Sequence, residues 1–124
     1  MDAGWIALQI LFGALGAVTR FGVMTVIKPG SWNWGLFTVN AVGSLVVGSV
    51  VGIFSTHTIT WAYTALVLAF CAGLTTFSTL AVDTARHIER REFRAGVVLI
   101  TSHVVIGVLL AAVGYISTSA VSSW

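Results

Sequence analysis

Charged side chains are scarce in this sequence: 8% of its 124 residues are Asp, Glu, Lys or Arg, whereas 57% are hydrophobic. A soluble domain carries about 25% charged residues, so this composition excludes an ordinary soluble domain and is typical of a membrane protein. A membrane-spanning helix needs roughly 20 mostly apolar residues, and the chain is therefore long enough for about four spans with short connections. No room is left for a soluble domain.

Cysteine is almost absent as well. Cys71 is the only one, which excludes a disulfide framework and a cysteine-based metal site. We expect it to be a small buried hydrophobic residue. The basic residues form no face that could hold phosphates, so nucleic acid is not an expected partner.

Catalytic groupings are also lacking. His57 and His103 lie on different segments, and neither has a carboxylate or nucleophile at a telling spacing. The sequence shows no ATP site and no redox centre. We therefore predict that the protein is not an enzyme.

Four apolar segments fill most of the chain. The first ends at Pro29-Gly30, a pair of residues that breaks helices, and the charged stretch 83–94 is predicted to be a loop between the last two segments. A polar tail follows the fourth segment. We expect an all-α membrane protein with a single domain, residues 1–124, whose transmembrane helices cover about 3–27, 34–54, 61–82 and 95–116.

The third segment contains an unusual polar interruption. Just after Gly73, hydroxyls occur at Thr75, Thr76, Ser78 and Thr79. Glycine loosens a helix, and Thr and Ser can bond to nearby backbone, so we predict that this helix is broken near its middle. The alternative is an unbroken helix whose hydroxyls bond its own carbonyls. Broken helices at membrane depth are typical of ion and substrate sites.

Ionisable groups are rare inside the predicted spans. Arg20 and His103 lie within them, and Asp83 lies at the edge of the third. A proton-coupled exporter usually needs a carboxylate well inside the membrane, and none occurs in the first, second or fourth segment. This favours a passive path lined by hydroxyls, the Asn40 amide and aromatic ring edges. Donors without fixed cations suit a small, hard anion.

Basic residues are distributed unevenly between the two sides of the membrane. Lys28 lies in the connection between the first and second segments. The connection between the third and fourth segments contains Arg86, Arg90, Arg91 and Arg94. Because basic residues stay in the cytoplasm, we predict that both of these connections face the cytoplasm and both termini face outside.

Three stretches resemble the CrcB/Fluc family of fluoride channels: "GALGAVTRF" at 13–21, "FTVNAVGSLVVG" at 37–48 and "FCAGLTTFSTL" at 70–80. The resemblance covers essentially the whole chain. It implies a small four-helix protein of the prokaryotic plasma membrane that forms an antiparallel dimer with two fluoride pores. The implied function is passive fluoride conduction, which lowers cytoplasmic fluoride and so reduces its toxicity.

The resemblance also implies which residues form the pore. Positions that line the family's pore correspond to Asn40, Phe77, Ser78, Thr79, Leu80 and His103. At position 80 the family has a second phenylalanine, and leucine offers no ring edge there. For His103 the alternative is a helix-to-helix hydrogen bond. On the fourth helix, hydroxyls are scarce beyond His103, so a polar track along that helix is not expected.

A structural, non-transported Na⁺ at the dimer interface is the cofactor that the resemblance implies. Its ligands would be the main-chain carbonyls of Ala72 and Thr75. The family commonly has glycine where this chain has Ala72. Arg20 matches an arginine near a vestibule of the pore, and a structurally paired arginine is the alternative.

Fluoride and membrane lipid are expected partners of the chain. Further alternatives concern the second chain of the dimer and the function. A chain with one fixed orientation cannot form an antiparallel homodimer, so the charge bias and Leu80 together favour a heterodimer with a related chain of opposite bias. In one version, this chain is a non-conducting partner subunit. A small four-helix proton-coupled exporter of hydrophobic cations is the less favoured function.

Overall fold

The computed structural model describes residues 2–122, and their regular secondary structure is entirely helical. The helices are α1 (Ala3–Val26), α2 (Trp34–Ser55), α3 (Trp61–Leu74), α4 (Phe77–Glu89) and α5 (Phe93–Ser122). Of these, α1, α2, the α3–α4 pair and α5 form 4 segments that are long and apolar enough to cross a membrane. The predicted all-α fold with four spans is confirmed, and the chain is a multi-pass membrane protein.

The last two spans are longer than predicted. Helix α4 runs to Glu89 instead of ending near residue 82, so the stretch 83–94 is mostly helical and the prediction of a loop there was wrong. Likewise, α5 continues to Ser122. The hydroxyl of Thr118 donates to the Gly114 carbonyl at 2.8 Å, which shows how a polar sequence is accommodated in a helix. Residues 123–124 of the predicted tail lie outside the described part.

A tight turn joins α4 to α5. The Arg91 N–H donates to the Ile88 carbonyl at 2.9 Å, and the Glu92 N–H donates to the His87 carbonyl at 2.8 Å. Arg91 has a φ of 60°. These two bonds and the left-handed residue form a Schellman motif, which normally has glycine at the left-handed position.

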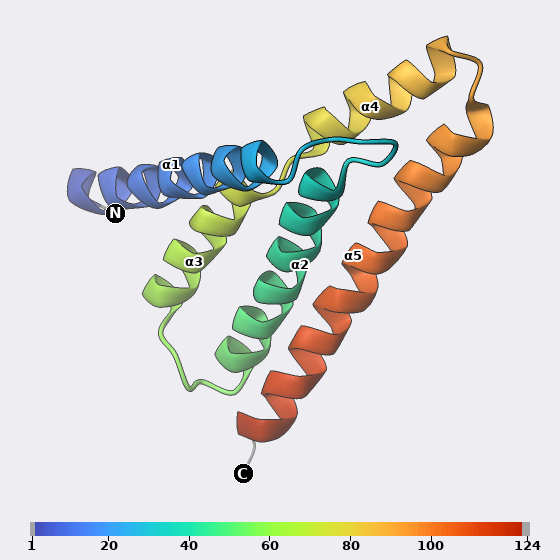
Figure 1. Cartoon of the computed structure of the whole chain (residues 1–124). Helices are drawn as coiled ribbons and strands as arrows, with labels where there is room; N and C mark the ends of the chain where they lie inside the picture. Colours follow the sequence, from blue (N-terminus) through green and yellow to red (C-terminus); the bar gives the residue numbers. More distant parts are fainter. Residues whose placement is uncertain (1, 123–124) are drawn as a thin grey trace.

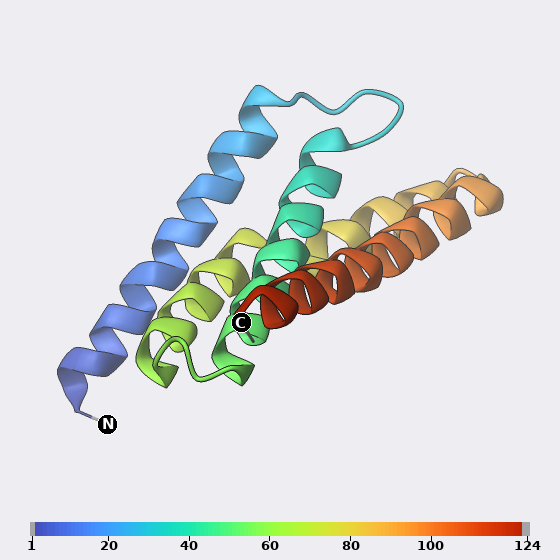
Figure 2. The ribbon, with the colours of Figure 1, turned by 90° about the horizontal axis from the view of Figure 1, so that it is seen from below.

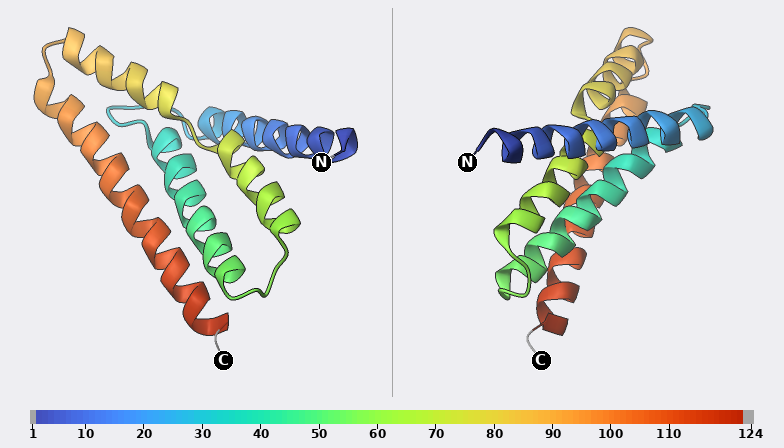
Figure 3. Two further views of the ribbon diagram at one scale, coloured as in Figure 1. Left: turned by 180° about the vertical axis from the view of Figure 1, so that it is seen from behind. Right: turned by 90° about the vertical axis from the view of Figure 1, so that its left-hand side faces the viewer.

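The helices form a layer that α1 crosses. Figure 1 shows α2 and α5 side by side and running in the same direction, with α3 on the other side of α2. At the break, the chain turns away from α3, and α4 packs beside the first turns of α5. Helix α1 lies across α3, as the view from below and the two side views also show (Figures 2 and 3).

Glycines allow the helices to touch backbone to backbone. A Cβ on Gly16 would collide with the Phe70 carbonyl of α3, and one on Gly48 would collide with the Ala111 carbonyl of α5. Small residues at such crossings are how helices associate closely in lipid. The second and fourth spans meet along such residues, because Gly107 of α5 also lies against the Ser44 hydroxyl of α2.

The buried core is small and lies near the cytoplasmic end predicted from charge. Leu36, Leu80 and Leu99 are its centre, with exposed fractions of 0%, 4% and 2%. Most large apolar side chains point outward instead; Val18 and Val108 are 68% and 65% exposed. Such a surface requires lipid or a partner chain as its solvent.

We predict that Gly48→Ala destabilises the protein by about 1–3 kcal/mol, the usual cost of overpacking. The new Cβ would lie 2.7 Å from the Ala111 Cα, and backbone cannot move aside as a side chain can. Thermal unfolding in neutral detergent measures the effect. The control is Gly22→Ala, which has nothing within 4 Å of the new atom and should be neutral or slightly stabilising, since alanine favours helix. Equal stability of the two variants would contradict the packing account.

Candidate functional site: the groove at the broken third span

Two extended residues separate α3 from α4. Thr75 has φ −82° and ψ 158°, and Thr76 has φ −149° and ψ 125°. β-Branched residues favour such extended conformations over helix, and Gly73 lies just before them. The predicted break in the third helix is confirmed, and the unbroken alternative is wrong.

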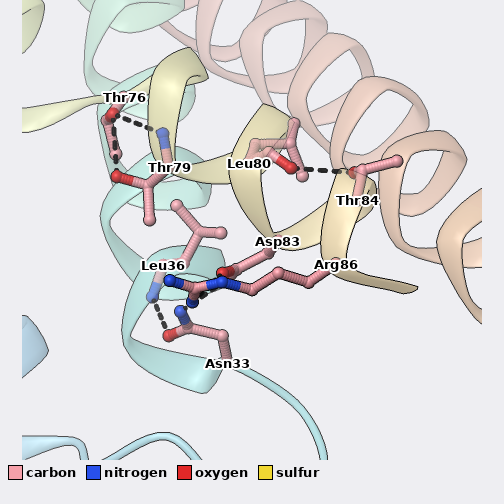
Figure 4. A network of polar contacts seen from close by, with 8 residues as sticks. All are labelled: Asn33, Leu36, Thr76, Thr79, Leu80, Asp83, Thr84 and Arg86. Atoms are coloured by element: carbon pink, nitrogen blue, oxygen red, sulfur yellow. Dashed lines mark hydrogen bonds and ion pairs between the residues drawn. The ribbon is translucent and has the colours of Figure 1, made fainter. Parts of the chain in front are cut away.

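Threonine side chains close both helix ends at the break. Thr75 donates from its N–H and its hydroxyl to the Cys71 carbonyl, at 2.9 and 3.0 Å. Thr76 is the N-cap of α4, and its hydroxyl oxygen accepts from the Thr79 N–H at 3.3 Å (Figure 4). Threonine at this position satisfies one of the donors that a helix start leaves without a partner. The role of Thr76 was not predicted, although a hydroxyl residue just before a new helical run is a recognisable capping signal.

The Asn40 side chain pairs with the backbone of Thr76 in the way that one peptide group pairs with another. The Thr76 N–H donates to Asn40 Oδ1 at 2.8 Å, and Asn40 Nδ2 donates to the Thr76 carbonyl at 3.1 Å. Both backbone groups lack the partners that an unbroken helix would supply. Because Thr76 is only 8% exposed, leaving them unpaired would be costly. Asn40 of α2 therefore holds the break in its extended shape.

Arg20 holds the other linker residue. Its Nη1 donates to the Thr75 carbonyl at 3.0 Å, from α1 to the end of α3. An arginine inside a span needs such a partner. Of the two roles considered for Arg20, this contact supports the structural one.

The two carbonyls expected to bind Na⁺ both lie at the break. The Thr75 carbonyl accepts from Arg20, and a carbonyl oxygen retains a second lone pair. The N–H of Thr76, which would bond the Ala72 carbonyl in a continuous helix, donates to Asn40 instead. Residues 2–122 contain no group of three or more His, Cys, Asp or Glu side chains suited to a metal.

A groove of about 400 Å³ opens beside the break, between α2, α4 and α5. Four of the residues predicted for the pore line it: Asn40, Phe77, Leu80 and His103. The Phe77 ring is the most open of these, with an exposed fraction of 71%. Ser44, Thr75 and Thr76 also line the groove, whereas Ser78 and Thr79 do not. The hydroxyls of the latter two lie 3.1 and 3.2 Å from that of Thr76.

Leu80 lies at the floor of the groove and not on its open side. It is 4% exposed and packs with Leu36 and Leu99 in the core. Figure 4 shows its carbonyl accepting from the Thr84 hydroxyl one turn later. The side chain thus gives the floor of the groove an apolar surface.

His103 is a buried polar group of the groove wall, with an exposed fraction of 8%. Its Nδ1 lies 2.9 Å from the Leu99 carbonyl in its own helix, so the helix-to-helix hydrogen bond considered from the sequence was wrong. The ring packs edge-on against Phe37 with centroids 5.3 Å apart. The Leu99 carbonyl can only accept, so Nδ1 is the donor of this bond. The other ring nitrogen, Nε2, is buried and has no hydrogen-bond partner within the described chain.

A second polar cluster lies one to two turns further along α4. Asn33 Nδ2 donates to Asp83 Oδ2 at 2.9 Å, and Arg86 lies 3.4 Å from the same carboxylate (Figure 4). Asn33 Oδ1 also caps α2 through the Leu36 N–H at 3.1 Å. The carboxylate at the membrane edge is therefore paired. This pair between distant parts of the sequence was not predicted, because no local pattern links residues 50 positions apart.

The profile of the family described as "CrcB-like protein, Camphor Resistance (CrcB)" matches residues 7–115. The chain belongs to the CrcB family. Among curated relatives, the "Fluoride-specific ion channel FluC" of Nitrobacter winogradskyi is 35% identical over 113 residues, which cover 82% of this chain and 86% of the relative. The protein of the same name from Pyrococcus horikoshii is 33% identical over 121 residues, or 94% and 97% of the two chains.

We predict that Asn40→Ala lowers the free energy of unfolding of this CrcB family chain by about 2–4 kcal/mol. Both polar backbone groups of Thr76 would lose their partner, and each buried unpaired group costs about 1–3 kcal/mol. Thermal unfolding in detergent is the measurement. Thr19→Ala is the matched control, because its hydroxyl bonds only the Leu15 carbonyl of its own helix and the change should cost little. An Asn40→Ala variant as stable as the control would contradict the role of Asn40 at the break.

Proposed function

We propose that this chain forms a fluoride-selective passive channel that lowers cytoplasmic fluoride, and that it is not an enzyme. Family membership and the name shared by its relatives support this function. The observation that carries the proposal is the groove at the broken span. Its lining combines an exposed aromatic ring, an amide and hydroxyls, and it includes no Asp, Glu, Lys or Arg.

The chemistry of the groove suits fluoride. Aromatic ring edges carry partial positive charge, and Phe77 offers such an edge in the same groove as the Asn40 amide and the Ser44 hydroxyl. These groups replace part of the hydration shell of a small anion without a fixed cation that would trap it. Fluoride enters cells as the neutral weak acid and dissociates inside, so a passive exit is sufficient.

A second chain, antiparallel to the first, completes this proposal. The groove is open on one side, where Phe77 is exposed, and a partner chain would cover it. The carbonyls of Ala72 and Thr75 supply only part of a Na⁺ coordination shell, and the partner's break would supply the rest. The ion would be structural: it would stabilise the partial negative charge of carbonyls gathered at the interface.

The charge bias still favours a heterodimer. Arg86, Arg90, Arg91 and Arg94 lie around the α4–α5 turn, and Lys28 lies at the end of α1, all on the side predicted to be cytoplasmic. Such a chain inserts in one orientation, with both termini outside. Its antiparallel partner would then be a related chain of opposite bias. A proton-coupled exporter is disfavoured, since Asp83, the carboxylate at the membrane edge, is paired with Asn33 and Arg86.

The first prediction from this function concerns the purified chain alone in liposomes, where biosynthetic orientation no longer applies. We expect rapid fluoride efflux, read with a fluoride electrode, and no chloride efflux under the same gradient. The small donor-lined groove explains the selectivity, because chloride is larger and softer. Protein-free liposomes are the control. Absence of fluoride efflux, both alone and with an oppositely biased relative co-reconstituted, would contradict the proposed function.

A second prediction concerns the version in which the chain is a non-conducting partner. We expect Leu80→Phe to bring no gain of conduction and to destabilise the fold by about 1–3 kcal/mol, as overpacking does. Position 80 is 4% exposed, so the ring would strain the core before it reached the open groove. Val82→Phe is the control, because Val82 is 49% exposed on the same helix. A clear gain of fluoride efflux in Leu80→Phe alone would instead identify a degenerate pore.

A further inference from the structure

The turn between α4 and α5 places an arginine where glycine would be more stable. Arg91 is the left-handed residue of the Schellman motif, with a φ of 60°, and this conformation is less favourable for arginine than for glycine. Strain of this kind is retained where the side chain is needed. Arg91 is exposed, and the turn that joins α4 to α5 lies at one end of the helical layer (Figure 1).

A groove of about 710 Å³ begins at this turn. Arg91 and Arg94 border it, and its surface is otherwise mostly apolar, with Phe93 and Val98 exposed by 59% and 50%. A second apolar groove along α5 shares Val98 and continues to Ile106. From Arg94 to Ile106 the helix rises roughly 18 Å, which is close to the depth of one bilayer leaflet's hydrocarbon, roughly 15 Å.

The two arginines are not neutralised by the acid beside them. Glu92 also lines the groove, but its Oε2 lies 2.7 Å from Nδ1 of His87 on α4. The ion pairs of residues 2–122 join Arg86 to Asp83 and His87 to Glu92, and they involve neither Arg91 nor Arg94. The groove thus has a free cationic end and a long apolar body.

We propose that this groove binds an anionic phospholipid, with the phosphate on Arg91 and Arg94 and one acyl chain along Phe93, Val98 and the second groove. Guanidinium groups bind phosphate oxygens through paired, charge-assisted hydrogen bonds. Anionic headgroups are attracted to basic residues at the cytoplasmic edge of a span. This interaction goes beyond conduction, because it fixes the depth of the α4–α5 turn in the bilayer whatever ion the groove at the break carries.

Native mass spectrometry of the full chain, titrated in neutral detergent with phosphatidylglycerol or phosphatidylcholine, tests the proposal. We expect phosphatidylglycerol to bind more tightly. Each arginine near the headgroup contributes about fivefold to the affinity. Arg91→Gly should therefore weaken phosphatidylglycerol binding about fivefold, and the double variant that also carries Arg94→Gln should weaken it about thirtyfold in total. Arg91→Gly should at the same time raise the unfolding temperature, because glycine suits the left-handed turn.

Two controls separate charge from backbone effects. His57 is the other non-glycine residue of the described chain with a positive φ, at 58°. His57→Gly should therefore raise stability without changing lipid affinity. Lys28→Gln removes a charge that does not line this groove and should also leave affinity unchanged. If Arg91→Gly unfolds the chain, Arg91→Gln removes the charge with the original Cβ in place.

Three results would overturn the proposal. One is equal affinity for the two lipids, and another is unchanged phosphatidylglycerol affinity in the double variant. The third is a change in the balance between monomer and dimer in the double variant, with lipid affinity unchanged. That result would mean that a second copy of the chain covers the groove.

Discussion

The structure depends on one constraint: a backbone that leaves the helix inside a membrane must still find a partner for every polar group. The break at Thr75 and Thr76 frees such groups within the third span. Asn40 satisfies the N–H and the carbonyl of Thr76, and Arg20 satisfies the carbonyl of Thr75. Since these side chains come from α2 and α1, the break can exist only while three spans stay packed around it.

Close helix packing is what brings those side chains within reach. Gly16 lies against the Phe70 carbonyl, so α1 approaches α3 closely enough for Arg20 to bond the linker. On the other side, a Cβ on Gly43 would collide with the methyl group of Thr75, so glycine there lets α2 carry Asn40 up to Thr76. The small residues and the polar residues of α1 and α2 thus serve one arrangement, because neither set would position the break without the other.

The sequence was sufficient to predict the four spans and the break, because the length of an apolar run and a cluster of Thr and Ser are local signals. The end of α4 was missed because charge alone does not end a helix: Arg86 and Asp83 pair within it, and the true end is set by the Schellman turn at Arg91. Leu80 was expected at the pore, yet whether it faces the groove's open side or its floor depends on how far α4 rotates after the break. The capping bond of Thr76 and the hold of Asn40 set that rotation, and neither is visible in one sequence.

The position of Asn40 reconciles its structural bond with its place in the groove wall. A side-chain amide has two N–H donors and one carbonyl oxygen. The oxygen and one N–H are occupied by Thr76, which leaves the second N–H for the groove that Asn40 lines. The residue that holds the break can therefore also present a fixed donor to an anion. Its orientation is preorganised, since turning the amide toward an ion in any other way would leave the Thr76 backbone unpaired. By the same reasoning, aspartate cannot replace it, because a carboxylate would face the Thr76 carbonyl without a proton to share.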